Sequence, residues 1–230
     1  MNKKREQQQY VENLKGIQVE LPYLLDAVSD TQKKFFANQD SLQAGLNICI
    51  EEISSGRADS ELAIWVIGCG QGEEAYSVAI MLDEHPSVFD FHLLGTDISE
   101  DSLQVARRAI YDADKVKNVP LPVIKNNFLR SRQKDKDLVR VAPEVRNKVA
   151  FRQINYARDF TLREKMDIVI CRNTLFYFHP SVQEVLLRKF CEFINPGGFF
   201  ISGNNEDFSR MRVPLIEMDE NIYRLETEDE

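Results

Sequence analysis

Short apolar runs alternate along most of this chain with segments whose apolar residues recur at helical spacing. The runs are nearly continuous in hydrophobicity, as strands buried on both faces of a parallel sheet must be. Strands are expected at residues 62–67, 91–97, 149–154, 166–171 and 199–202. Helices are expected at residues 41–53, 73–82, 99–110 and 181–194. The alternation predicts an α/β fold, a mostly parallel sheet with helices on both faces.

Three segments depart from the strand–helix alternation. Residues 111–150 contain two prolines, a basic run and a short strand-like piece at 138–141, which predicts an inserted small subdomain. Residues 1–58 carry apolar positions at helical spacing and predict a short helical N-terminal segment ahead of one domain at residues 59–230. Residues 215–218 and 222–225 predict a closing antiparallel hairpin, and Asn-Pro-Gly-Gly at 195–198 predicts a turn that stops the preceding helix.

A glycine-rich loop joins the first expected strand to the helix after it. Its glycines are Gly68, Gly70 and Gly72, and Glu73 follows directly. A strand, a glycine loop and a helix let the backbone approach a nucleotide-like ligand. The spacing Gly-x-Gly-x-Gly, followed by a carboxylate, favours S-adenosylmethionine (SAM) over a dinucleotide, because SAM has no phosphate to place on the helix N-terminus.

Asp97 ends the second expected strand, 25 residues after Gly72. That interval is close to the one at which such folds present an acid to a ribose diol. A carboxylate can accept hydrogen bonds from both ribose hydroxyls, and SAM brings no phosphate to repel it. The alternative is that Asp97 caps the next helix, a role for which Ser99 is equally suited.

Polar side chains also follow the third and fourth expected strands. Asn155 follows the third, Arg172 and Asn173 follow the fourth, and Tyr177 comes shortly after. Because the carboxyl ends of parallel strands meet at one edge of a sheet, we expect these residues to converge. The two asparagines offer donors and acceptors to an adenine edge or an amino-acid group, although a turn or cap role is an alternative for each.

The composition limits the remaining classes of function. The 230 residues suffice for one α/β domain and a small accessory piece, and no apolar run approaches the ~20 residues that a membrane span requires. Four widely spaced cysteines match no zinc pattern and suggest reduced thiols in the cytoplasm, so no metal site is expected. The net charge of −8 argues against nucleic-acid binding. Residues 111–150, however, carry a net charge of +5, which suits an acidic partner or a merely solvated face.

Several motifs together resemble the CheR-type chemotaxis-receptor methyltransferases, which use SAM to esterify receptor glutamates. They are Gly-Glu-Glu-Ala-Tyr-Ser at residues 72–77, Thr-Asp-Ile at 96–98, Cys-Arg-Asn-Thr-Leu-Phe-Tyr-Phe at 171–178 and Asn-Pro-Gly-Gly at 195–198. Val-Arg-Val with Pro-Glu-Val-Arg at 139–146 also fits. The resemblance covers roughly residues 60–210 and implies a class I SAM-dependent methyltransferase (Rossmann-like) fold with an inserted subdomain.

The resemblance also implies roles for individual residues and a protein partner. We expect the SAM-binding residues to be Gly68, Gly70, Gly72, Glu73, Asp97, Ile98, Asn155, Tyr156 and Asn173. We expect the catalytic residues to be Arg172, Asn173 and Tyr177. S-adenosylhomocysteine would be the product, and a receptor-like protein substrate would dock on residues 111–150. A glutamate with a pKa of about 4.3 is already ionised at neutral pH, so its esterification requires no general base.

The chain departs from the family pattern at its N-terminal motif. Family members carry Thr-x-Phe-Phe-Arg over the cofactor, whereas residues 33–37 here read Lys-Lys-Phe-Phe-Ala, so Ala37 stands at the arginine position. The family sequence Gly-His-Ser-Glu also reads Gly-Asn-Asn-Glu at residues 203–206. Two alternatives therefore stay open: a catalytically weak SAM-binding sensor or interaction module, and a small-molecule methyltransferase. The glycine spacing disfavours an NAD-dependent oxidoreductase.

Overall fold

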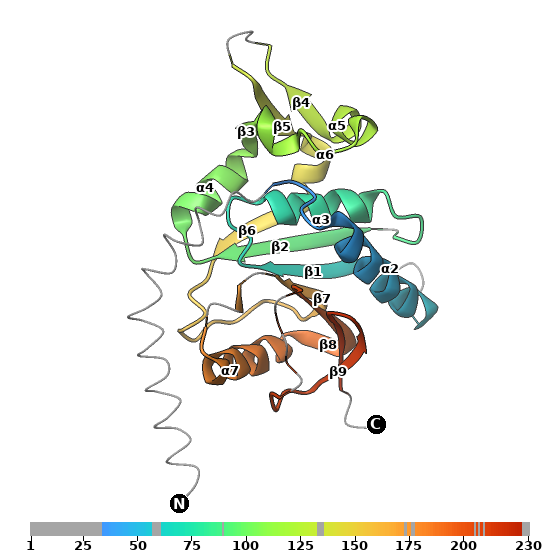
Figure 1. The fold of residues 1–230 in the computed structure, drawn as a ribbon, viewed down its shortest axis with the longest axis vertical. Coiled ribbons are helices and arrows are strands. Elements are labelled where there is room, and N and C mark those ends of the chain that lie inside the picture. The colour runs from blue at the N-terminus through green and yellow to red at the C-terminus, as the bar shows by residue number, and fades with distance from the viewer. Residues whose placement is uncertain are drawn as a thin grey trace, which may run out of the picture.

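The computed structural model describes residues 34–56, 61–88, 90–132, 136–172, 174–175, 178–204, 206, 208 and 210–226. A seven-stranded sheet of order β6-β2-β1-β7-β8-β10-β9 forms its centre (Figure 1). The strands are β1 Leu62–Ile67, β2 Phe91–Asp97, β6 Val149–Gln153, β7 Met166–Cys171, β8 Ile194–Ser202, β9 Leu215–Asp219 and β10 Ile222–Leu225. The first five in this order pair in parallel, and β10 pairs antiparallel with β8 and β9. The predicted α/β fold and the closing hairpin are confirmed.

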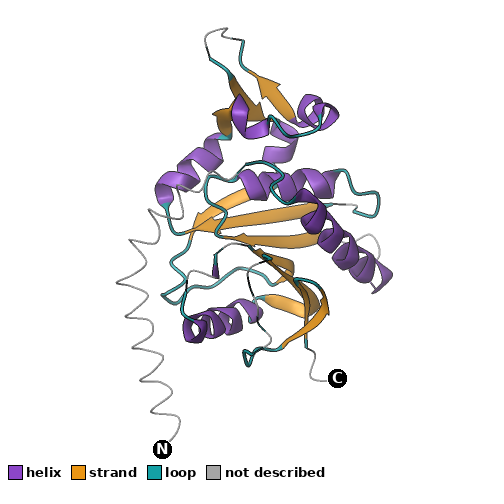
Figure 2. Cartoon of the chain, viewed as in Figure 1, coloured by secondary structure: helices purple, strands orange, loops and turns teal. Residues whose placement is uncertain are grey.

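Helices cover both faces of this sheet (Figure 2). The helices α2 Gln39–Gly56, α3 Glu73–Asp83 and α4 Glu100–Arg108 contribute to one apolar core, and α7 Pro180–Cys191 contributes to the other. Side chains alternate between the two cores along β1, with Ile64 in the first core and Trp65 in the second. Burial on both faces explains why β1 and β7 read as continuous apolar runs rather than alternating ones.

The strand order indicates where along the sheet a ligand is expected to bind. From β1 the chain adds β2 and then β6 on one side, and later adds β7 and β8 on the other side. The direction of winding therefore reverses at β1, between its neighbours β2 and β7. In open parallel sheets, ligands bind outside the carboxyl ends of the strands at such a reversal. The loops after β1, β2 and β7 meet at that position.

Residues 110–146 build a separate small sheet between α4 and β6. Its strands β3 Ile110–Asp112, β5 Leu138–Val141 and β4 Phe128–Arg130 are antiparallel in the order β3-β5-β4. The short helices η1 Ala113–Val116, α5 Leu121–Asn127 and α6 Pro143–Arg146 lie beside them. Figure 1 shows this sheet on the far side of α3 from α7. It stays attached to the main core partly through Phe35, whose ring packs edge-on against Tyr111 and Phe128 at 5.0 Å.

The structure differs from the prediction at residues 195–198. The helix ends at Cys191, and β8 already begins at Ile194, so Asn-Pro-Gly-Gly lies inside the strand. Ile194 pairs with Met166 and Phe199 pairs with Ile168, which leaves residues 195–198 as a bulge opposite Asp167. A Cβ atom on Gly198 would lie 2.8 Å from the Asp167 carbonyl oxygen, so the bulge requires glycine there. The helix expected within residues 1–33 lies outside the described residues.

Candidate functional site

The glycine loop after β1 adopts a conformation that requires glycine. Gly68, Gly70 and Gly72 have φ angles of 67°, 55° and 94°, in the left-handed region that other residues rarely adopt. A Cβ atom on Gly68 would lie 2.2 Å from Thr174 Oγ1, a distance that no real contact tolerates. The loop after β1 therefore touches the loop after β7, as the predicted convergence of strand ends requires.

Asp97 holds the glycine loop in place. Its Oδ2 accepts a hydrogen bond from the Gly70 N–H at 2.8 Å, and its Oδ1 accepts one from the Ser99 N–H at 2.9 Å. Ser99, not Asp97, is the N-cap of α4, because the Ser99 hydroxyl oxygen accepts from the Ser102 N–H. A carboxylate has about four lone-pair sites, so two backbone donors leave Asp97 able to accept ligand hydroxyls as well.

Glu73 is buried at the start of α3, with 1% of its side chain exposed. Its Oε1 lies 2.7 Å from the Nζ of Lys115, a residue of the small sheet's η1 helix. Its Oε2 has no hydrogen-bond partner within the described part of the chain. A buried acceptor without a donor costs about 1–3 kcal/mol, so a ligand donor at Oε2 would remove a penalty that the protein alone carries. This orphaned oxygen fits a cofactor that presents hydroxyl or ammonium groups.

Tyr156 is hydrogen-bonded to the backbone of the glycine loop. Its hydroxyl oxygen accepts from the Gly68 N–H at 3.2 Å and shares a hydrogen bond with Thr96 Oγ1 at 2.8 Å. Thr96 Oγ1 in turn accepts from Trp65 Nε1. Burial raises the pKa of Tyr156 well above its usual range, and the charge of Asp97 raises it further, so the phenol stays neutral.

Two other expected cofactor contacts make local backbone interactions. The Asn155 Oδ1 accepts from the Ala157 N–H at 3.0 Å, the pattern of an Asx turn. The Ile98 carbonyl oxygen accepts from Gln153 Nε2 at 2.8 Å. Both residues follow strands of the site edge, β6 and β2 respectively. Asn173 and Tyr177 lie outside the described residues.

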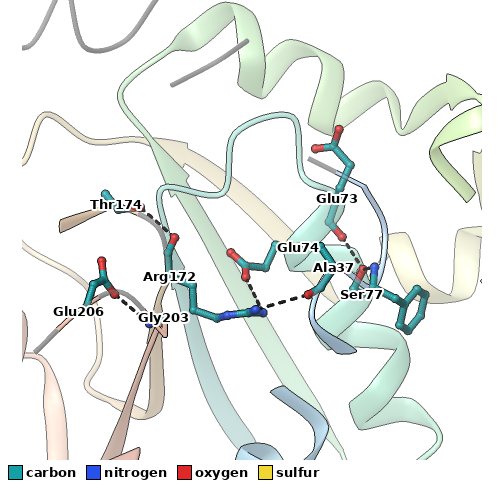
Figure 3. A network of polar contacts seen from close by, with 9 residues as sticks. Ala37, Glu73, Glu74, Ser77, Arg172, Thr174, Gly203 and Glu206 are labelled. Carbon is teal, nitrogen blue, oxygen red and sulfur yellow. Dashed lines mark hydrogen bonds and ion pairs between the residues drawn. The ribbon is translucent and has the colours of Figure 1, made fainter. Parts of the chain in front are cut away.

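Arg172 forms a buried ion pair with Glu74 of α3 (Figure 3). Arg172 Nη1 lies 3.0 Å from Glu74 Oε1, and the two side chains are 5% and 13% exposed. Arg172 Nη2 also donates to the Ala37 carbonyl oxygen at 3.4 Å. The residue at the family's arginine position is therefore connected through its backbone to the loop after β7, while its own side chain is exposed.

The segment before α2 closes over α3 next to this pair. The Phe36 N–H donates to Ser77 Oγ at 2.9 Å, and Ser77 Oγ donates to the Glu73 carbonyl oxygen (Figure 3). The Phe35 N–H donates to the Lys115 carbonyl oxygen. Residues 34–38 therefore contact the main sheet's α3 and the small sheet's η1 helix at the same time.

Sequence reasoning missed the roles of Glu74, Lys115 and Glu206. Glu206 is buried, and its two carboxylate oxygens accept from the Leu175 and Gly203 N–H groups at 2.9 and 2.8 Å. Two of these residues could have been found from their place in family motifs. Glu74 lies in the Gly-Glu-Glu motif, and Glu206 keeps the glutamate of the family sequence Gly-His-Ser-Glu. Lys115 carried no sequence signal beyond its place in the basic segment.

Among the described residues, no group of three or more His, Cys, Asp and Glu side chains is arranged to hold a metal ion. No helix among these residues is long and apolar enough to cross a membrane.

Comparison with known proteins gives consistent matches. The family model described as the CheR methyltransferase SAM-binding domain matches residues 31–223. Chemotaxis protein methyltransferase 2 of Pseudomonas aeruginosa is 35% identical over 165 residues, which cover 70% of this chain and 59% of that protein. The chemotaxis protein methyltransferase of Escherichia coli is 29% identical, covering 74% of this chain and 60% of that protein. That of Borreliella burgdorferi is 30% identical, covering 82% and 68%. The chain thus spans about three fifths of the first two relatives' length.

Proposed function

The chain belongs to the CheR methyltransferase family through its SAM-binding domain, and we propose that it transfers the methyl group of SAM to glutamate side chains of a chemotaxis-receptor-like protein. The names of the relatives support this substrate class over a sensor module or a small-molecule methyltransferase. The observation that carries the proposal is the meeting of the glycine loop, Asp97 and the Arg172 loop at the point where the sheet winding reverses.

The residues of the site suit SAM in charge and in shape. Asp97 and Glu73 present carboxylate oxygens that accept from ribose hydroxyls or from the ammonium group, and Glu73 Oε2 is buried without another donor. The glycines of the loop remove side chains where the ligand and the Thr174 loop come close. The carboxylates of Asp97 and Glu73 do not suit a phosphate, because each would repel its negative charge.

The chemistry asks little of the protein beyond positioning. Bound SAM supplies an electrophilic methyl group on a sulfonium. The receptor carboxylate is ionised at neutral pH and attacks without a base, so the chain's task is alignment and exclusion of water. In this proposal Asn173 and Tyr177 face the reacting groups, and Arg172 and Glu74 hold their loop on α3.

Removing the Asp97 carboxylate should weaken SAM binding. Asp97→Ala is expected to cost about 1.5–3 kcal/mol, the range for hydrogen bonds to charged groups, or about 10- to 150-fold in Kd. Isothermal calorimetry with SAM and with S-adenosylhomocysteine measures it. Asp101→Ala, an exposed acid in the first turn of α4, is the control and should bind as wild type. Because Asp97 also holds Gly70, thermal unfolding of each variant must show that the fold persists. Unchanged affinity of Asp97→Ala would rule out its role.

We further propose that the receptor docks on the small sheet and that the chain works in the cytoplasm. On one face of this sheet Arg140 lies in register between Ile110 and Leu129, which are 43% and 54% exposed. An exposed cation between apolar side chains suits a receptor segment that carries an acid beside apolar residues. The net charge of +5 over residues 111–150 favours the same partner. All four cysteines are buried and unbridged, which is typical of a reducing compartment.

Reversing the charge at Arg140 should weaken receptor docking without affecting the cofactor. Arg140→Glu is expected to raise the KM for a receptor fragment several-fold and to reduce the salt dependence of association, because rim charges act mainly on association. SAM affinity should be unchanged. Lys125→Glu makes the same charge change on α5, outside the surface formed by Ile110, Arg140 and Leu129, and is the matched control. Equal effects of the two variants would show that net charge, not this face, governs docking.

A further inference from the structure

We propose that Glu206 is a positioning residue that fixes the loop after β7 against the glycine loop. Its expected effect on turnover rests on the proposed function, whereas its effect on the loop does not. Glu206 acts through the backbone of Leu175, which lies midway between Asn173 and Tyr177 in the sequence.

The Glu206 carboxylate joins two separate pieces of backbone. One oxygen accepts from the Leu175 N–H at 2.9 Å. The other accepts from the Gly203 N–H at 2.8 Å (Figure 3). Hydrogen bonds to a carboxylate are about twice as strong as neutral ones, and here both are buried. An amide side chain cannot replace this arrangement, because it has only one acceptor oxygen for two N–H donors.

The backbone around Glu206, just after β8, is itself held by hydrogen bonds. The Glu206 N–H donates to the Gly203 carbonyl oxygen at 3.1 Å, and the Ser202 N–H donates to the Asn221 carbonyl oxygen at 2.9 Å. Asn221 lies in the turn between β9 and β10, and its Nδ2 also donates to Asn204 Oδ1 at 3.4 Å. The hairpin therefore braces the backbone from which Glu206 reaches toward Leu175.

The position of Leu175 matters because the residue before it, Thr174, is packed tightly against the glycine loop. Thr174 lies against Gly68 so closely that no Cβ fits between them, and its hydroxyl donates to the Arg172 carbonyl oxygen at 3.3 Å. Leu175 is itself fully buried in the core beneath the loop. A shift of the Leu175 backbone would therefore displace the residues on either side of it. A misplacement of about 1 Å in a catalytic constellation can cost about 100-fold in rate.

The test compares Glu206→Gln with Asp167→Asn. Asp167 is another buried carboxylate that accepts from a backbone N–H, that of Ala63, and from Asn195 Nδ2, but it lies at the opposite end of β7. For Glu206→Gln we expect kcat on a receptor fragment to fall about 10- to 100-fold, with the KM and the SAM Kd within about twofold of wild type. Asp167→Asn should lose stability with kcat little changed.

Amide hydrogen exchange measures how firmly the loop after β7 is held, independently of activity. Exchange of the Leu175 or Gly203 N–H should be at least about tenfold faster in Glu206→Gln than in wild type, and unchanged in Asp167→Asn. Glu206→Asp, which keeps the charge but shortens the reach, should be intermediate and serves if Glu206→Gln does not fold. Wild-type exchange and wild-type kcat in both Glu206 variants would overturn the inference, as would an equal fall of kcat in Asp167→Asn. An inactive wild type would refute the proposed function, and the exchange rates would still decide the role of Glu206.

Discussion

Replacing Glu74 by glutamine is expected to lower the free energy of unfolding by about 3–5 kcal/mol, because it leaves the buried guanidinium of Arg172 without its counter-charge. Urea denaturation measures this loss. The control is Glu184→Gln, which breaks the exposed pair between Arg188 and Glu184, and such pairs contribute about 0–1 kcal/mol.

The double variant Glu74→Gln/Arg172→Met separates the charge from the packing. Removing both charges should recover a large part of the stability, since most of the loss in Glu74→Gln comes from the uncompensated buried charge of Arg172. A loss in Glu74→Gln no larger than that in Glu184→Gln would mean that Arg172 is solvated in solution and does not anchor its loop to α3.

The second large effect is expected on turnover. If Tyr177 faces the reacting groups, Tyr177→Phe should lower kcat about 100-fold, the lower range for losing one preorganised donor at a reacting centre. SAM affinity should stay within about twofold, because the hydroxyl acts on the aligned transition state rather than on cofactor binding. Methyl transfer to a receptor fragment and calorimetry with SAM measure the two quantities.

Tyr223→Phe provides the control for the loss of a tyrosine hydroxyl elsewhere in the fold, on β10. It should leave kcat close to the wild-type value. Should Tyr177→Phe turn over as fast as wild type, the hydroxyl would have no part in the transfer, and Tyr177 would be a packing residue.

The sequence pattern predicted those features that depend on local chemistry. Strand β7 has the predicted bounds, because a strand buried on both faces must be apolar throughout. The glycine loop was recognisable because Gly68 and Gly72 adopt angles that other residues disfavour. The place of Asp97 at the end of β2 was predicted, whereas its hydrogen bond to the Gly70 N–H was not.

Contacts between distant parts of the chain could not be predicted in this way. Glu73 pairs with Lys115 and Arg172 pairs with Glu74 across 42 and 98 positions of sequence, so each pair depends on how the elements pack. The bulge at residues 195–198 shows that local sequence chemistry can also give a wrong prediction. Asn-Pro-Gly-Gly has the local chemistry of a turn, but pairing with β7 on both sides draws it into β8.

Methyl transfer to a receptor fragment from SAM labelled in its methyl group tests the central claim most directly. The account predicts that the label enters the fragment and is released as methanol by mild base, because glutamate methyl esters hydrolyse whereas methylated amines and thioethers do not. Asp97→Ala should reduce the transfer at limiting SAM. A fragment that stays unlabelled while the chain binds SAM, or a label that resists base, would contradict the proposal that this chain esterifies receptor glutamates.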